Sequence, residues 1–457
     1  MGRVNRNAIA AMVGIAVASV NYRLAGAADT PLDPEAVERG RIAVTTVGHL
    51  KPAWTTETYK NVSKLWGVPA PDPDGDPEGY AAAFRHRYGF APAPYPNDGL
   101  PMGLKRGVNP DGTKTGISID CLTCHGSSVG GTSYVGIGNS QLDLKLFFNE
   151  MMKADGKRVP PSTFVVNSSR GTVNAGMFSV ILLSLRNTDL SFRKFPLLTW
   201  ANLPEIDTPP WWLLKKKSTM YYDGRTDADS VRTNMQFLLG EKTLEQFKAL
   251  EPTFRDVRTY FLSLEPPKYP FSIDQAKAER GREVFTKSCV KCHGTYGDKA
   301  EYPNRIVPLD EIKTDSARAL GIAPRFVAHY NATWFGEGSP VDLEMKGYQA
   351  PPLDGIWASA PYLHNGSVPT LATLLKSSDR PSRFYRPPST GFENYDQANV
   401  GWKFDRPTEP IDPSVPIERS HSLFDTSRFG LGNGGHTYGD ALSDVARSDL
   451  IEYLKTL

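Results

Sequence analysis

Apolar residues recur at helical spacing in three stretches of the chain. Residues 272–288, "SIDQAKAERGREVFTKS", place Gly281 and Phe285 on one face, which predicts a helix. Residues 252–267 and 442–457 predict two further amphipathic helices with similar closing letters, "YFLSL" and "EYLKTL". The same closing helix is therefore used twice, and we expect a domain boundary near residues 265–270, "EPPKYP".

The N-terminus carries a different apolar pattern. Residues 8–20 form an uncharged run of 13 residues behind a segment with two arginines, and "AGA" follows at residues 25–27. This pattern predicts a secretory signal peptide over residues 1–27, and export to the bacterial periplasm or beyond. An uncleaved anchor is the alternative, although 13 residues are few for a bilayer. No later stretch is long and apolar enough, so we expect no stable membrane span.

The composition is ordinary for a globular protein, with 40% apolar residues, 22% charged residues and a formal net charge of +2. This balance argues against nucleic acid as a partner, because nucleic-acid binders normally carry a basic stripe. The 40 glycines and 37 prolines predict much loop. We expect an N-terminal extension over residues 28–90, and a polar insertion of loops with a hairpin over residues 376–430.

All four cysteines fall in two C-x-x-C-H motifs. These are Cys121, Cys124 and His125, and Cys289, Cys292 and His293. Such spacing lets two sulfurs bond the haem vinyl groups while the histidine becomes the proximal iron ligand. A zinc site and two disulfides are the alternatives, but zinc ribbons space their cysteine pairs by about 15–20 residues, far less than here, and neither alternative explains the histidine after each pair. The motifs therefore predict two covalently attached haem c groups. Residues 77–90 are the candidate helix before the first motif.

The second half resembles a class I cytochrome c domain. In such domains the helix before C-x-x-C-H packs a Gly/Phe face on an aromatic residue of the last helix. The resemblance therefore implies that Gly281 and Phe285 contact Tyr453. The sixth ligand of the second haem has several candidates in this half: His329, His364, His421, His436 and Met345.

Residues 360–371, "APYLHNGSVPTL", resemble the signature of bacterial dihaem cytochrome c peroxidases and MauG-type enzymes. The longer pattern, through "GNGGHTYG" at 432–439, is more similar to the rubber-oxygenase-like branch of that superfamily. In that branch a histidine near the C-terminus completes the second haem, which implies that His436 is this ligand. We expect His364 to be a buried structural histidine and His421 to be solvated.

The first half carries an aromatic stretch that resembles the same superfamily. Residues 220–235, "MYYDGRTDADSVRTNM", resemble a segment in which an aromatic residue before Asp-Gly-Arg lies between the haems. That residue is Tyr222 here. Trp211 and Trp212 stand just upstream, and the rubber-oxygenase-like proteins have an aromatic pair near the first haem. The resemblance implies a catalytic role for these three residues, and core packing is the alternative.

The first motif lacks a histidine that the peroxidases have. Their gating histidine follows the first C-x-x-C-H, but no histidine lies between His125 and His293 in this chain. A ligand would have to come from a methionine, from His49 or His86, or from the second half. We therefore expect an open or water-bound first haem. Glu150 is a candidate distal acid, or else an exposed helix residue.

Together these features predict a mainly α fold with much loop and two tandem class I cytochrome c-like domains, at residues 91–267 and 268–457. The N-terminal extension and the insertion complete it. The function expected is a periplasmic dihaem oxidoreductase, a peroxidase or a dioxygenase. Its first haem would activate peroxide or O2, and its second would exchange electrons with a partner such as a small periplasmic cytochrome. A non-enzymatic electron-transfer cytochrome is the alternative.

Overall fold

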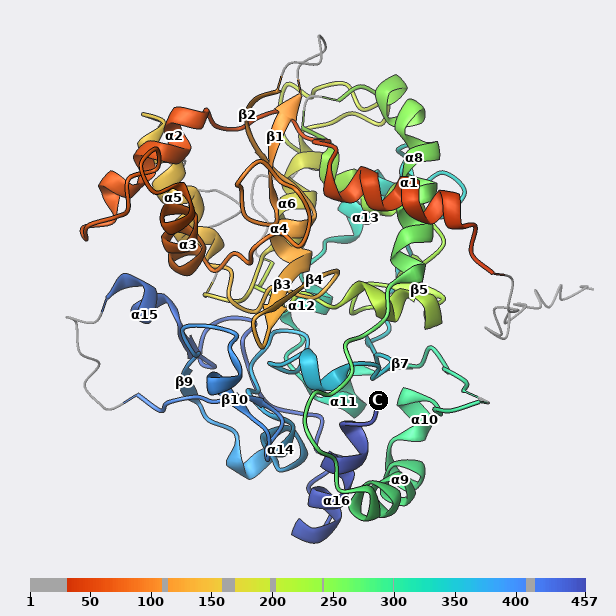
Figure 1. The fold of residues 1–457 in the computed structure, drawn as a ribbon. Helices are drawn as coiled ribbons and strands as arrows, with labels where there is room; N and C mark the ends of the chain where they lie inside the picture. Colours follow the sequence, from red (N-terminus) through yellow and green to blue (C-terminus); the bar gives the residue numbers. More distant parts are fainter. Residues whose placement is uncertain are drawn as a thin grey trace, which may run out of the picture.

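The computed structural model describes residues 31–108, 114–157, 169–197, 203–240, 242–298, 300–407 and 416–457. The expected signal peptide, residues 1–27, lies outside these ranges. Helices and loops dominate the described chain, and its sheets are all two-stranded and antiparallel (Figure 1). Within the described ranges, no helix has the length and apolarity that crossing a membrane requires.

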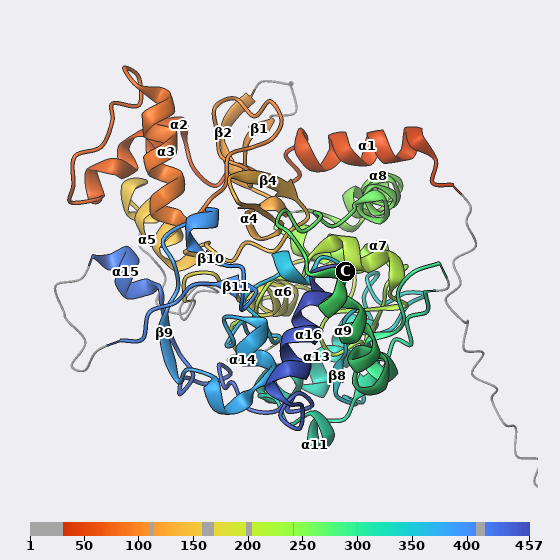
Figure 2. The same cartoon turned by 60° about the horizontal axis from the view of Figure 1, so that its bottom comes forward.

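Two helix pairs frame the molecule. Helix α9 (Gln275–Ser288) packs on α16 (Asp444–Leu454), and α1 (Pro34–Thr45) packs on α8 (Leu244–Ser263) (Figures 1 and 2). Gly281 brings α9 close, because a Cβ there would lie 2.0 Å from the carbonyl oxygen of Asp449. The rings of Phe285 and Tyr453 lie 5.2 Å apart. The contact expected between Gly281, Phe285 and Tyr453 is therefore present.

The α1–α8 pair repeats this contact almost atom for atom. A Cβ at Gly40 would lie 2.1 Å from the Asp256 carbonyl oxygen, and Arg39 pairs with the Asp256 carboxylate at 2.7 Å. In the second pair Arg280 meets Asp449 at 2.8 Å. Both α1 and α9 contain the letters "ERGR". Residues 34–45, which the sequence analysis assigned to the extension, therefore pair with α8 as α9 pairs with α16.

The expectation that residues 77–90 form the matching helix is wrong. Helix α3 (Pro77–Tyr88) instead packs on α5 (Leu144–Ala154), within an aromatic core that also holds α2 (Thr56–Asn61). The helix forms because Asp76 caps it, Pro77 begins it and Gly89 ends it in the left-handed region. Nearby elements are η1 (Val62–Leu65), β1 (Leu104–Val108) and β2 (Lys114–Ile119).

The first C-x-x-C-H motif forms the short helix α4 (Leu122–His125), followed by the hairpin of β3 (Gly126–Val129) and β4 (Thr132–Val135). The second forms α10 (Val290–His293) at the end of α9. Between them lie α6 (Ala175–Ser184), η2 (Trp211–Lys216), β5 (Thr219–Met220), β6 (Thr226–Asp227), α7 (Val231–Met235) and η3 (Gln236–Leu238).

After the second motif the chain forms short elements around α16. These are β7 (Ile306–Val307), α11 (Leu309–Ile312), α12 (Ala317–Leu320), α13 (Pro324–Asn331), β8 (Tyr348–Gln349), η4 (Ile356–Ala358) and α14 (Leu371–Leu375). The polar insertion contributes η5 (Ser377–Asp379), β9 (Arg383–Tyr385), η6 (Phe392–Asn394), β10 (Tyr395–Asp396), β11 (Gly401–Trp402), α15 (Ile417–His421) and β12 (Leu423–Asp425).

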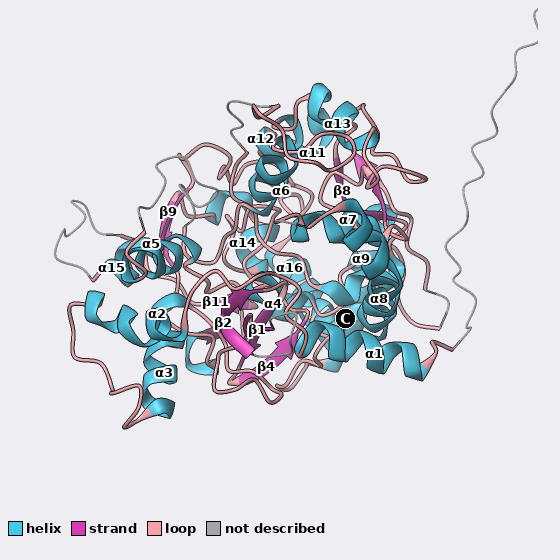
Figure 3. Ribbon diagram, turned by 90° about the horizontal axis from the view of Figure 1, so that it is seen from above, coloured by secondary structure: helices cyan, strands magenta, loops and turns pink. Residues whose placement is uncertain are grey.

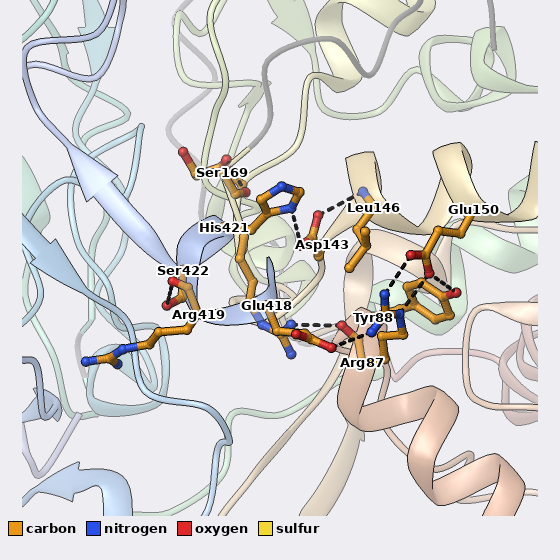
Figure 4. A network of polar contacts seen from close by, with 12 residues as sticks. Arg87, Tyr88, Asp143, Leu146, Glu150, Ser169, Glu418, Arg419, His421 and Ser422 are labelled. Carbon is orange, nitrogen blue, oxygen red and sulfur yellow. Dashed lines mark hydrogen bonds and ion pairs between the residues drawn. The ribbon is translucent and has the colours of Figure 1, made fainter. Parts of the chain in front are cut away.

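The insertion reaches back to the first half through α15 (Figure 4). Glu418 pairs with Arg87 of α3, and Nδ1 of His421 lies 2.8 Å from a carboxylate oxygen of Asp143. Arg87 also forms a double hydrogen bond with Glu150 of α5. Residues far apart in the sequence thus form one polar network, and His421 is a partner in it rather than a merely solvated residue.

Candidate haem-binding sites

A cavity of about 400 Å³ lies at the second C-x-x-C-H motif. Cys289, Cys292 and His293 line it, and His436 lines it from the loop before α16. The rest of the wall is mostly apolar: Leu213, Phe285, Leu353, Ile356, Leu371, Leu375, Leu450 and Leu454. A concave, largely apolar pocket with a few polar groups is the usual form of a cofactor site.

His293 is held in the tautomer that a metal ligand needs. Its Nδ1 lies 2.8 Å from the carbonyl oxygen of Pro351, which can only accept, so Nδ1 donates. The proton therefore sits on Nδ1, and the lone pair of Nε2 is left for a metal. Burial lowers the pKa of His293, and this favours the neutral ring that binds metals.

His436 occupies a strained and tightly held position. Its φ angle is 45°, in the left-handed region that Gly435 before it also adopts at 72°. The backbone N–H of His436 donates to the Ile312 carbonyl at 2.8 Å. The guanidinium of Arg380 donates to the carbonyls of Gly435 and His436 at 2.7 and 3.0 Å. A costly backbone conformation persists only where its surroundings over-determine it, as they do here.

The separation of the two imidazoles fits a shared iron. The ring centroids of His293 and His436 lie 6.2 Å apart. Two imidazoles that bind one metal ion at about 2.0 Å each have centroids roughly 6 Å apart. Burial, and secondarily the nearby His293, lowers the pKa of His436 to about 4, and Nδ1 of this ring is buried without a hydrogen-bond partner. The donor set, the spacing and the apolar wall all fit haem c.

The same cavity has a polar wall at His364. This ring stacks on Tyr348 at 4.3 Å and lies edge-on to Tyr222 at 6.0 Å. His364 is 6% exposed, as expected of a structural histidine, yet its Nε2 makes no hydrogen bond. Burial, and next the charge of Arg318, lowers the pKa of His364 to about 3. Burial raises the pKa of Asp207, on the same wall, to about 8.

The other candidate ligands of the second haem lie outside this cavity wall. Met345 packs against the small apolar cluster that includes Val307 and Ile312. His329 lies on α13, and His421 belongs to the network with Asp143. Of the sequence candidates, His436 and His364 are thus the two that line the cavity, and His436 pairs with His293.

The first motif places His125 in a dry, aromatic environment. Trp211 stacks on the His125 ring at 4.7 Å and on Phe261 of α8 at 3.9 Å. Burial lowers the pKa of His125 to about 4. The Pro209 carbonyl offsets part of this shift, although Nδ1 of His125 makes no hydrogen bond of ordinary geometry. The neutral ring and the paired cysteines are the donor set that haem c requires.

The three aromatic candidates lie in different places. Trp211 contacts His125, whereas Trp212 points into the core of the second half and donates its indole N–H to the Asp354 carbonyl at 2.8 Å. Tyr222 lines the cavity at the second motif, hereafter the second cavity, and donates to the Asp207 carbonyl at 3.0 Å. The two adjacent tryptophans therefore face the two motif regions separately. Lys215 pairs with Glu265, and Lys216 pairs with Asp354.

Glu150 is neither exposed nor a free acid. It is 7% exposed, it receives two hydrogen bonds from Arg87, and Tyr88 donates to it at 2.6 Å. His49 and His86 also lie away from His125 in their contacts. His49 donates from Nε2 to the Ala43 carbonyl at 3.0 Å, and His86 is exposed on α3.

Sequence reasoning missed residues that act through backbone contacts. Arg380, Pro351 and Pro209 hold or face the motif histidines, but their side chains carry no haem signal. The close pair of glycines before His436 was the available hint for Arg380, because such a loop exposes carbonyls that need donors. No pattern pointed to Pro351 or Pro209.

Known proteins match parts of this chain. Residues 347–385 match a family model described as "RoxA-like, cytochrome c-like". Two curated proteins of Sinorhizobium fredii (strain NBRC 101917 / NGR234) are similar. "Uncharacterized protein y4iM" is 32% identical over 247 residues, 44% of this chain and 53% of the relative. "Uncharacterized protein y4iJ" is 29% identical over 281 residues, 47% of this chain and 44% of the relative. The chain spans about half the length of these relatives.

The segment that matches the family model carries much of the second cavity. Residues 347–385 include Tyr348, Pro351, His364 and Leu371, which line it, and Arg380, which holds the His436 loop. A cytochrome c-like domain carries covalently bound haem c through C-x-x-C-H. Residues 347–385 are therefore similar to a cytochrome c-like domain, which is a haem-binding type of domain.

Proposed function

We propose that this protein is an exported dihaem c-type cytochrome with oxidoreductase activity, built from two tandem cytochrome c-like domains. One haem would be held by Cys121, Cys124 and His125, and the other by Cys289, Cys292 and His293. The matched helix pairs support the tandem arrangement, since Gly40 on Asp256 repeats Gly281 on Asp449. Each pair accompanies one C-x-x-C-H motif.

The second haem would be the electron carrier, with His293 and His436 as axial ligands. The observation that carries this proposal is the 6.2 Å separation of the two rings in one cavity with both cysteines. Two neutral imidazoles fixed by Pro351 and Arg380 need little rearrangement when the iron changes charge. A small periplasmic cytochrome is the electron partner we propose.

The first haem would be the reactive one. A haem held there by Cys121, Cys124 and His125 would supply the iron that activates peroxide or O2. The chain's own contribution at this site is to hold His125 neutral and to cover it with Trp211, which keeps water from the ring. His49 contacts the Ala43 carbonyl and His421 pairs with Asp143, and these contacts away from His125 support an open position.

Residues 207–213 would connect the two sites. Trp211 stacks on His125 and the Pro209 carbonyl faces that ring, while Asp207, Pro210 and Leu213 line the second cavity. Tyr222 donates to the backbone of Asp207. One short segment thus touches the proximal side of the first motif and the wall of the second cavity, which suits it to electron transfer between them.

The ligand assignment is tested by His436→Ala, with His364→Ala as the matched control in the same cavity. We expect His436→Ala to turn one haem high-spin in the optical spectrum. His364→Ala should leave the spectral bands of both haems unchanged. The result that contradicts the assignment is an unchanged spectrum of His436→Ala with two haems still attached.

The enzymatic proposal needs a turnover assay. We expect either hydrogen peroxide reduction with a reduced cytochrome as donor, or O2 uptake with an unsaturated hydrocarbon, and loss of that activity in His125→Ala. If the protein neither reduces hydrogen peroxide nor takes up O2, and its reduced form does not bind CO, the proposed enzymatic activity is wrong. The protein would then be a non-enzymatic electron-transfer cytochrome.

A further inference from the structure

A smaller cavity of about 90 Å³ lies apart from the cavity at His293. It sits between α6, α12 and α13, which lie close together in Figure 3. Two adjacent tyrosines separate these cavities, because Tyr222 lines the cavity at His293 and Tyr221 lines the smaller one. None of the residues that line the smaller cavity belongs to a C-x-x-C-H motif.

The wall of this cavity carries a buried cation, Arg318, whose hydrogen-bond donors are only partly used. Arg318 is 5% exposed, and its Nε and Nη1 make no hydrogen bond. Its nearest acid is Asp223, at 3.7 Å, which is beyond hydrogen-bond length. Asp223 is already engaged by Arg225, whose Nε and Nη2 lie 3.2 and 3.1 Å from the same carboxylate oxygen. Two buried guanidinium groups thus share one carboxylate.

Such an arrangement is costly unless an anion joins it. A buried charge is tolerated when it is paired and hydrogen-bonded, and a guanidinium presents a planar fork that matches a carboxylate. The ten-residue helix α6 also begins at this cavity, with Ala175 and Gly176 in the wall. The positive end of its dipole favours an anion at the same place.

The remaining wall fits a carboxylate on a small apolar body. Ser179, Thr233, Gln236 and Tyr221 form a hydrogen-bonded polar row, in which Ser179 donates to Gln236 at 2.7 Å and Gln236 donates to Tyr221 at 3.1 Å. Asp223, Arg225, Thr226 and Tyr330 also line the cavity, and the apolar part of the wall includes Val180, Ile206, Ile322, Phe326, Val327 and Val341. Tyr221 keeps a strained φ of 64° at this wall.

We propose that Arg318 binds a carboxylate in the cavity between α6, α12 and α13. The carboxylate has two sources, a free small carboxylate anion or a propionate of a bound haem. The second source rests on the proposed haem function, whereas the first stands without it. The two are distinguished with the haem-loaded protein.

The first arm titrates sodium acetate into the haem-loaded protein, against sodium chloride at equal ionic strength, and follows the thermal unfolding midpoint. A ligand that binds the folded state raises this midpoint in a saturable way. If the site takes a free anion, Arg318→Gln weakens acetate binding on the order of 10- to 100-fold, the worth of a charge-assisted hydrogen bond. The exposed Arg255→Gln is the control and leaves binding unchanged.

The second arm measures the midpoint potentials of the haems. If a propionate occupies Arg318, acetate does not bind, and Arg318→Gln lowers the potential of one haem because a nearby cation is lost. Arg255→Gln leaves the potentials unchanged. The proposal is overturned if acetate does not bind and Arg318→Gln leaves both potentials in place.

Gly176→Ala keeps the test decisive if Arg318→Gln does not fold. A Cβ at Gly176 would meet its neighbours at 3.5 Å or more, so the variant folds, but it would stand 3.8 Å from Nε of Arg318. We expect the added methyl group to weaken acetate binding or to shift the same haem potential. If neither quantity changes in Gly176→Ala, the carboxylate does not lie against Nε of Arg318 and the proposal fails.

Discussion

The position of His436 depends on Arg380 more than on any property of the histidine itself. Arg380 donates to five carbonyls, those of Thr373, Leu374, Asn433, Gly435 and His436. Without these bonds the left-handed backbone of residue 436 loses its support. One guanidinium therefore joins α14 to the loop that carries the proposed ligand.

We expect Arg380→Gln to weaken the His436 ligation and to lower the thermal unfolding midpoint. Each charged hydrogen bond is worth about 1.5–3 kcal/mol, so even partial loss is measurable. Part of one haem should become high-spin, and the optical spectrum at several temperatures checks it. Arg419→Gln, which breaks an ion pair with the exposed Asp405 and a cation–π contact with Tyr385, is the control. A wild-type spectrum in Arg380→Gln would falsify the proposal that Arg380 positions His436.

Glu150 is expected to act on stability and not on catalysis. It is half of a buried double hydrogen bond with Arg87, and removing one partner of a buried pair costs about 3–5 kcal/mol. Glu150→Gln should therefore lower the free energy of unfolding by about that amount, measured with urea, while turnover stays normal. The exposed Glu245→Gln is the control. Normal stability with lost turnover would restore Glu150 as a distal acid.

His49 gives the protein a defined acid sensitivity. Burial, and next the charge of Lys105, lowers the pKa of His49 to about 4, from an ordinary value of 6.5. Between these values the unfolded chain binds the proton and the folded one does not, so stability falls as pH falls from about 6.5 to 4. Above about pH 6.5, His49 is neutral in both the folded and the unfolded chain, so its burial then carries no protonation cost.

We expect His49→Gln to reduce the loss of stability between pH 7 and pH 5 by roughly 1–2 kcal/mol, since its side chain cannot take up a proton. The free energy of unfolding of both proteins at the two pH values checks this. An equal loss in variant and wild type would show that His49 does not contribute.

At the scale of elements, the two helix pairs share one steric rule. Glycine lets α1 approach the Asp256 carbonyl and lets α9 approach the Asp449 carbonyl, where a Cβ would lie within 2.1 Å in each case. No side chain can stand there without moving the partner helix. The arginine one position earlier adds an ion pair to the same acidic residue.

Gly40→Ala and Gly281→Ala should therefore each destabilise the protein by about 1–3 kcal/mol, as overpacking does. Gly176→Ala is the matched control, because its added Cβ has room. Thermal unfolding of the three variants checks the rule. A control as damaged as the other two would mean that helix glycines matter here for another reason.

The sequence made α8, α9 and α16 predictable but not α1. The first three show a helical apolar period that ends at a proline pair, at a C-x-x-C-H motif or at the chain end. Helix α1 shares "ERGR" with α9, but some 75 residues of inserted chain separate it from its motif, whereas α9 adjoins its own. Residues 77–90 lie closer to the first motif in the sequence and were therefore predicted to be its preceding helix. Their aromatic residues instead pack in a separate core.

At the scale of the whole molecule, long-range polar contacts join the parts. Arg87 meets Glu418 and Asp143 meets His421 (Figure 4). Such pairs form between segments that no local pattern connects, so sequence spacing could not foresee them. The same holds for Pro351 and Arg380, which act through backbone carbonyls. The donor sets rest on spacing alone, because thioether attachment demands C-x-x-C-H, and haem attachment at both motifs stays a prediction.

The two halves differ most at their histidines. His293 shares a cavity with His436, whereas the His125 ring stacks on Trp211 and faces the Pro209 carbonyl. Under the function proposed above, this asymmetry would place electron storage at the second haem and reactivity at the first. It predicts two haems in different spin states within one chain.

The electron paramagnetic resonance spectrum of the fully oxidised, haem-loaded protein tests this most directly. It should contain one low-spin ferric signal, from the iron between His293 and His436, and one high-spin ferric signal of equal intensity from the iron at His125. Two low-spin signals, with no high-spin component across the neutral pH range, would contradict an open first site and leave electron transfer as the function.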